Sequence, residues 1–281
     1  MIWLLLSLYW ISNVTWQLLI KKAVNSGRHY ASVSAAIMLV ASVVSLTVAP
    51  VFEWQWPSGL YGYLLPLIST ILLASSSRLE IIARQDLPVS EVVIVNRLRA
   101  VMFILGAIVI LGERPGPIML LGAAIIVFAN LLAAYNGGKF IINKSFWQLM
   151  VASLLVVIST FIDVEASKQF NLGFFLSVSF LLRALFFVAI DPVTRFDVLA
   201  ELRSGGKLRI IATGSALALS VIVTIIGFQR FEYSQFEPLR STATFLTILI
   251  ASRVNSEDNH NILRKLLAAI LVVVGVYLIS S

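Results

Sequence analysis

Long apolar runs alternate with short polar breaks along all 281 residues of the chain. A membrane-spanning helix needs about 20 mostly apolar residues. Inside lipid every backbone polar group needs an internal partner, so each long run is expected to be an α-helix. The fold class predicted is therefore an all-α membrane protein with ten spans, at 2–20, 31–50, 60–77, 88–111, 117–135, 145–165, 173–190, 208–229, 235–252 and 262–280.

The breaks between the runs carry turn-forming or charged residues, as at 57–59 (Pro-Ser-Gly) and 136–138 (Asn-Gly-Gly). Such residues favour loops and end helices. Only the break at 191–207 is long, and its mixed charge predicts a small helix at the membrane interface.

The two halves of the chain share a pattern. Ser90 and Ser234 open spans 4 and 9, and Glu113 and Glu257 follow those spans, both pairs being 144 residues apart. Residues 1–138 and 139–281 are therefore predicted to be two repeats of five helices each. Because five is odd, the second repeat must be inverted relative to the first. Inverted repeats are typical of secondary transporters, which bind substrate near the midplane between the repeats.

Composition supports the membrane assignment and removes several function classes. Hydrophobic residues make up 59% of the chain and charged residues 12%, against about 25% charged in soluble domains. The net charge of +7 lies mostly in short loops, so no nucleic-acid partner is predicted. The absence of cysteine excludes disulfides and thiolate catalysis. No histidine lies in a predicted span, so neither a metal site nor another cofactor is expected.

Two short motifs carry a family resemblance. The chain reads Leu-Gly-Glu-Arg-Pro at 111–115, between spans 4 and 5, and Trp-Ile-Ser-Asn at 10–13 in span 1. With five plus five spans, it resembles the drug/metabolite transporter superfamily in its EamA-type branch. The resemblance implies alternating-access transport of small metabolites and leaves the substrate open. The second half departs from the motif, reading Val-Asn-Ser-Glu at 254–257.

The basic residues predict an orientation. Loops on the side of the two termini hold Arg114, Lys168 and Arg230, whereas the opposite loops hold fourteen Lys and Arg residues. Basic loops stay in the cytoplasm, so both termini are predicted on the non-cytoplasmic side of a plasma (inner) membrane. Many members of the resembled family have cytoplasmic termini, so loop charge and resemblance disagree on this point.

Ionisable residues inside spans are costly and usually face a cavity or a partner. Span 4 carries Arg97 and Arg99, span 7 carries Arg183, and span 9 carries Glu237 and Arg240 on one helical face. These charges mark the predicted substrate-binding region. Neighbouring polar and aromatic residues complete the candidate set: Asn96, Thr244, Asn13, Gln17 and Trp10.

The balance of these charges predicts the substrate class. Near the midplane, four arginines face one clear carboxylate, Glu237. An anionic substrate would complete the pairing, because the arginine fork suits carboxylate or phosphate. Two alternatives stay open at this point: the arginines pair with carboxylates of the protein, or the chain exports zwitterionic amino acids or amphipathic amines.

The other predictions concern coupling and class. Glu237, Glu91 and Asp163 are candidates for proton coupling, with ion pairing to nearby arginines as the alternative. Glu113 is expected to cap the following helix or to brace its loop. Small residues such as Gly122 and Gly275 would allow close helix packing in spans 5 and 10. The sequence thus predicts a secondary transporter, not an enzyme, whose partners are membrane lipid and a small-molecule substrate. A channel or an intramembrane enzyme is the minor alternative, and no oligomeric state is predicted.

Overall fold

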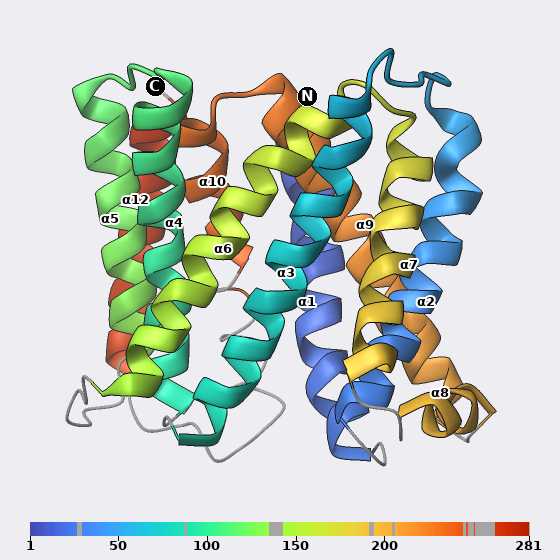
Figure 1. Ribbon diagram of the computed structural model, residues 1–281. Helices are drawn as coiled ribbons and strands as arrows, with labels where there is room; N and C mark the ends of the chain where they lie inside the picture. Colours follow the sequence, from blue (N-terminus) through green and yellow to red (C-terminus); the bar gives the residue numbers. More distant parts are fainter. Residues whose placement is uncertain are drawn as a thin grey trace. The chain divides into compact units, whose positions relative to one another are not determined.

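The computed structural model describes residues 1–26, 30–86, 89–134, 143–190, 194–203, 206–243, 246, 250 and 262–280. Regular structure in these residues is helical, without strands, which confirms the predicted all-α class (Figure 1). The elements are α1 (Ile2–Ser26), α2 (Tyr30–Val48), η1 (Ala49–Val51), α3 (Leu60–Asp86), α4 (Val89–Leu111), α5 (Pro117–Ala134), α6 (Lys144–Ser167), α7 (Leu172–Ile190), α8 (Thr194–Arg203), α9 (Lys207–Arg230), α10 (Tyr233–Ser241) and α12 (Ile262–Ser280).

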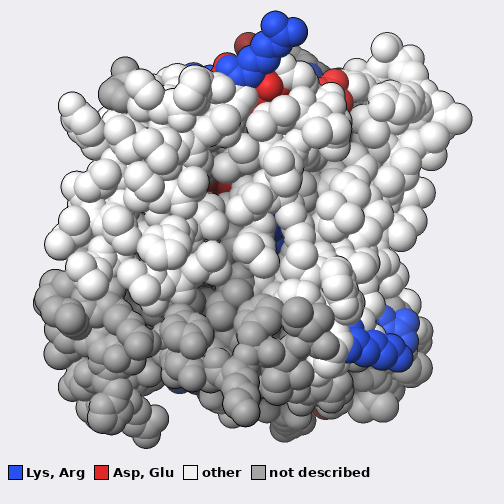
Figure 2. All heavy atoms as spheres, turned by 90° about the vertical axis from the view of Figure 1, so that its left-hand side faces the viewer, with Lys and Arg blue, Asp and Glu red and all other residues white. Residues whose placement is uncertain are grey.

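Six of the described helices are long and apolar enough to cross a membrane. They are α1, α2, α3, α6, α7 and α9. Each overlaps one predicted span, and several extend past its ends. On the face drawn in Figure 2, the described surface is mostly uncharged, with acidic and basic side chains at its top edge and basic ones at the lower right. The chain is therefore a multi-pass integral membrane protein.

Two predicted segments differ from the helices observed. α3 continues past residue 77 to Asp86 because Arg78, Glu80 and Arg84 end the apolar run without breaking the helix. The ninth predicted span, 235–252, starts with α10, which ends at Ser241, and most of its remainder lies outside the described residues. The short helix predicted within 191–207 is confirmed by α8.

The chain divides into two compact units. Unit 1 comprises Met1–Ala74 and Ser159–Gln229, and unit 2 comprises Ser75–Ile158 and Arg230–Ser281. The first part of α3 and the last part of α6 belong to unit 1, and their other parts belong to unit 2. Each unit therefore combines helices from both predicted repeats, 1–138 and 139–281. The units are defined by contacts between residues, whereas the repeats are inferred from a shared sequence pattern. The division into units therefore does not test the repeats, which stay a prediction.

In unit 1, α2 lies against α7 along its length (Figure 1). Gly173 lets the two helices approach, because a Cβ there would lie 2.7 Å from the Ser45 carbonyl oxygen on α2. Ser42 on α2 donates a hydrogen bond to the Ser177 carbonyl at 2.8 Å. Asn171, just before α7, donates to the Ala49 carbonyl at 2.8 Å. These contacts fix the start of α7 against the end of α2.

In unit 2, α5 lies against α12, and α10 packs on α4 and α5 (Figure 1). The two helices α5 and α12 cross at glycines, since a Cβ on Gly122 would lie 2.8 Å from the Gly275 carbonyl oxygen. The expectation that these glycines allow close helix packing is therefore confirmed within this unit. α5 begins with Pro117, whose fixed φ suits the first helical position.

Candidate functional site

A charged cluster lies buried in unit 1, where α3, α6 and α7 meet. Asp163 on α6 is 5% exposed, and its Oδ2 lies 3.5 Å from Nη2 of Arg183 on α7. Ser69 on α3 donates a hydrogen bond to the other carboxylate oxygen, Oδ1. Three helices thus supply one anion, one cation and one hydroxyl to the same buried position. The alternative that midplane arginines pair with carboxylates of the protein applies here.

The pairing with Asp163 does not use all the N–H groups of the Arg183 guanidinium. Its Nη2 also donates to Ser179 at 3.0 Å, and its Cζ lies 5.2 Å from the centre of the Phe180 ring. Among the described residues its buried Nε has no hydrogen-bond partner. Charge-assisted N–H···O bonds are typically about 2.7–2.9 Å long, so the 3.5 Å separation from Asp163 is a loose ion pair.

A second buried ion pair, in unit 2, is tight. Arg240 donates to Glu237 Oε2 from Nε at 2.7 Å, and its Nη2 lies 2.5 Å from the same oxygen. The two residues are three apart on α10, as the sequence predicted, and Glu237 is 4% exposed. The Arg240 guanidinium also lies 5.7 Å from the centre of the Phe103 ring on α4. This guanidinium is therefore held firmly by its own helix and by α4.

Arg99 on α4 adds a second cation to this part of unit 2. Its Nη2 donates to Ser153 on α6 at 3.4 Å, and its charge acts on the Glu237 carboxylate. At the end of α10, Asn130 of α5 donates to Ser241 at 3.2 Å. Two arginines, Arg99 and Arg240, thus act on the Glu237 carboxylate.

Glu113 contacts a helix that the sequence did not indicate. Its Oε1 accepts the Tyr233 N–H at 2.7 Å and its Oε2 accepts the Ser234 N–H at 3.0 Å. Glu113 therefore caps α10, 120 residues along the chain, and not the following helix α5, while the alternative that it braces its own loop stays a prediction. The 144-residue offset between Ser90 and Ser234 related spans 4 and 9 but could not place a turn against a distant helix.

The remaining candidates divide between described and undescribed side chains. On α1, Gln17 donates to Asn13 at 2.6 Å, and the buried Nε1 of Trp10 has no partner among the described residues. These three residues belong to unit 1. The side chains of the other candidates lie outside the described part of the chain, and their roles stay predictions: Arg97, Asn96, Glu91 and Thr244.

The structure thus distributes the predicted site residues between the two units. Arg183 and Asp163 come together in unit 1, and Arg99, Glu237 and Arg240 come together in unit 2. Arg183 pairs with Asp163, as in the alternative of ion pairing within the protein, and its contact with an anionic substrate stays a prediction. Sequence reasoning missed the supporting groups, Ser69, Ser179, Ser153 and Phe103, because serine and phenylalanine in apolar helices carry no distinguishing pattern.

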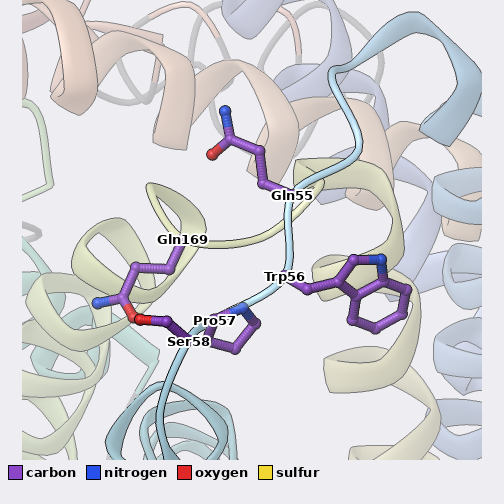
Figure 3. Close-up of a pocket in the computed structure, with 5 residues that line it drawn as sticks. All are labelled: Gln55, Trp56, Pro57, Ser58 and Gln169. Carbon is purple, nitrogen blue, oxygen red and sulfur yellow. The ribbon is translucent and has the colours of Figure 1, made fainter.

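A pocket of about 450 Å³ lies apart from these charges in unit 1, lined by Gln55, Trp56, Pro57, Ser58 and Gln169. It is formed by the loop before α3 and the turn after α6, and in Figure 3 the Trp56 ring points away from Gln169. Its side chains are uncharged, and none of the predicted site residues lines it. Elsewhere in the described chain, no group of three or more His, Asp or Glu residues is placed to hold a metal ion.

Comparison with known proteins gives information on the fold and none on the function. No family model matches the chain, and no curated protein matches it. A solved structure titled "Crystal structure of protein" is similar with a TM-score of 0.76 and 13% sequence identity, covering 98% of this chain and 94% of that one. At this identity the likeness concerns the fold alone. The chain shares its helical fold, over nearly its whole length, with a protein of known structure.

Proposed function

We propose that the protein is a secondary transporter that carries a small, anionic metabolite across the membrane by alternating access. The proposal includes ten spans in two inverted five-helix repeats, as in the drug/metabolite transporters that the sequence resembles. Transport of this kind requires no cofactor. Its partners are the lipid bilayer and the substrate, and Asp163 and Glu237 are the described candidates for proton coupling.

The observation that carries the proposal is the set of charges inside apolar helices. Arg183 pairs with Asp163 in unit 1, and Arg99 and Arg240 act on Glu237 in unit 2, with both carboxylates buried. Buried ionisable groups in a membrane protein are expensive and usually mark a substrate or ion pathway. The arginine fork suits carboxylate and phosphate, so an anionic substrate is the class that these arginines would bind.

Helix pairing supports the repeat within this proposal. α2 packs on α7 and α5 packs on α12. These are predicted spans 2 with 7 and 5 with 10, which hold equivalent places in the two repeats. In each pair the helices approach closely at a glycine, Gly173 in the first and Gly122 in the second. An inverted repeat would bring equivalent helices together in this way.

A thermal-stability screen tests the substrate class. Purified protein at low ionic strength is mixed with panels of carboxylates, phosphorylated metabolites and organic amines, and its melting temperature is measured. We expect stabilisation by anions, reduced in Arg183→Gln and Arg99→Gln and kept in Lys168→Gln, an exposed control. Preferential stabilisation by amines would contradict the anionic assignment and favour the amine alternative.

A further inference from the structure

The start of α10 is buried inside unit 2, where its backbone needs partners. Tyr233 is 5% exposed and Ser234 is 1% exposed. The first N–H groups of any helix have no acceptor within the helix. The N-cap residue, Glu232, makes no side-chain hydrogen bond to them. Acceptors for these N–H groups must therefore come from another part of the unit.

Glu113 supplies both acceptors. One carboxylate oxygen takes the Tyr233 N–H at 2.7 Å and the other takes the Ser234 N–H at 3.0 Å. A carboxylate at a helix N-terminus gains from charge-assisted hydrogen bonds and from the helix dipole. Gly112 makes the position possible, because its φ of +69° ends α4 in a left-handed turn that suits glycine. The Leu-Gly-Glu-Arg turn thus supplies the carboxylate that caps the start of α10.

The two ends of α10 are both fixed by the α4–α5 hairpin. Glu113 holds the start, and Asn130 bonds Ser241 at the end. Glu237 and Arg240 lie between these anchors, on a helix of nine residues. A helix rises about 1.5 Å per residue, so Glu237 and Arg240 lie close to the start of α10. A shift of that start therefore moves the ion pair as well.

We propose that Glu113 is a positioning residue: by clamping the first two N–H groups of α10, it sets where Glu237 and Arg240 stand against Arg99 and Phe103. The inference rests on the proposed function, which makes this ion pair part of the substrate site. Glu113 itself touches no substrate. Its removal frees the start of α10 while the rest of the fold remains.

The absence of cysteine allows a test by single reporters. Thr242→Cys places a thiol at the end of α10, at a site 4% exposed, and Thr213→Cys places one on α9 of unit 1, at a site 0% exposed. Each reporter is combined with Glu113→Ala, Glu113→Gln or Glu232→Gln, and its alkylation rate by a membrane-permeant maleimide is measured. Glu232→Gln is the matched control, an adjacent acidic residue without a capping bond.

We expect Glu113→Ala to speed alkylation at position 242 by about a hundredfold or more, the loss expected for two hydrogen bonds to a charged acceptor. Glu113→Gln keeps one acceptor oxygen and should give a smaller increase. Glu232→Gln should change nothing, and the rate at position 213 should stay constant in every variant. If Glu113→Ala does not fold, the Glu113→Gln rates at positions 242 and 213 decide alone.

An unchanged rate at position 242, or an equal rise at both positions, would overturn the inference. The first result would mean that α10 does not depend on Glu113, and the second that Glu113 supports only global stability. Alkylation needs no substrate, so this outcome is separate from that of the transporter proposal. A failure to transport would remove the substrate site and leave the clamp standing.

Discussion

The two buried ion pairs differ in how tightly their partners are held. Arg240 and Glu237 meet at 2.5 and 2.7 Å on one helix, whereas Arg183 and Asp163 are 3.5 Å apart on two helices. A tight pair compensates most of the cost of burying its charges, while a loose pair leaves donors to bind something else. Because its Nε has no hydrogen-bond partner among the described residues, Arg183 is the stronger candidate for substrate contact.

Breaking the tight pair should be costly. We expect Glu237→Gln or Arg240→Gln alone to lower the free energy of unfolding by about 3–5 kcal/mol, because one buried charge loses its partner. The double variant should lose less than the two single losses added together. Denaturant titration in detergent measures this cycle, with the exposed pair Glu165 and Lys168 as the control, worth about 0–1 kcal/mol. Additive losses at Glu237 and Arg240 would show that the pair is not coupled.

The Ser69 hydroxyl should matter more than an ordinary helix serine. Ser69→Ala removes a donor to the buried Asp163 carboxylate, and hydrogen bonds to charged groups contribute about 1.5–3 kcal/mol. Ser7→Ala is the control, since Ser7 is exposed and bonds only its own helix at the Trp3 carbonyl. The melting temperatures of the two variants should differ clearly. Equal melting temperatures would argue that Ser69 does not stabilise the cluster.

At the scale of helices, hydrophobic pattern predicted position well and pairing poorly. The runs 117–135 and 262–280 became α5 and α12 within one residue, because lipid demands a continuous helix wherever the chain is apolar. Their mutual packing did not follow from pattern, since apolar faces carry no record of their partner. The contact of Glu113 with α10 was also missed, because the sequence of a turn does not show which distant helix packs beside it.

The α5–α12 crossing gives a direct test of helix packing. A Cβ on Gly122 would lie 2.8 Å from a carbonyl oxygen, and one on Gly275 would lie 2.6 Å from the Ile126 side chain. Gly122→Ala and Gly275→Ala should each destabilise the protein by about 1–3 kcal/mol through overpacking. Gly59→Ala is the matched control, because nothing lies within 4 Å of its added Cβ. A neutral effect at Gly122 and Gly275 would refute the close crossing.

At the scale of the whole molecule, a chain with ten spans has both termini on one side of the membrane. The excess of basic residues in the loops opposite the termini predicts that side to be non-cytoplasmic. A C-terminal reporter that is active only in the cytoplasm should stay inactive, and a periplasmic-type reporter should be active. Cytoplasmic activity at the C-terminus would show that loop charge misassigns this chain and that the family default holds.

The sequence predicted the class of molecule and the residues that carry charge into it, because both follow from the cost of polar groups in lipid. It could not assign specific partners: ion pairing of Asp163 with an arginine was an alternative to proton coupling, but the sequence did not show that the arginine would be Arg183. Pairings between distant residues depend on how helices pack, and this is the information that a single pattern of apolar runs does not contain.

Solute counterflow in proteoliposomes shows whether the protein is a carrier. Vesicles that contain the purified protein are loaded with an unlabelled anion chosen from the stability screen, and uptake of the labelled anion is followed. An alternating-access carrier predicts a transient accumulation of label above the outside concentration, weakened in Arg183→Gln and kept in Lys168→Gln. Simple equilibration of label without any overshoot, alike in protein-free vesicles, would contradict transport by this protein.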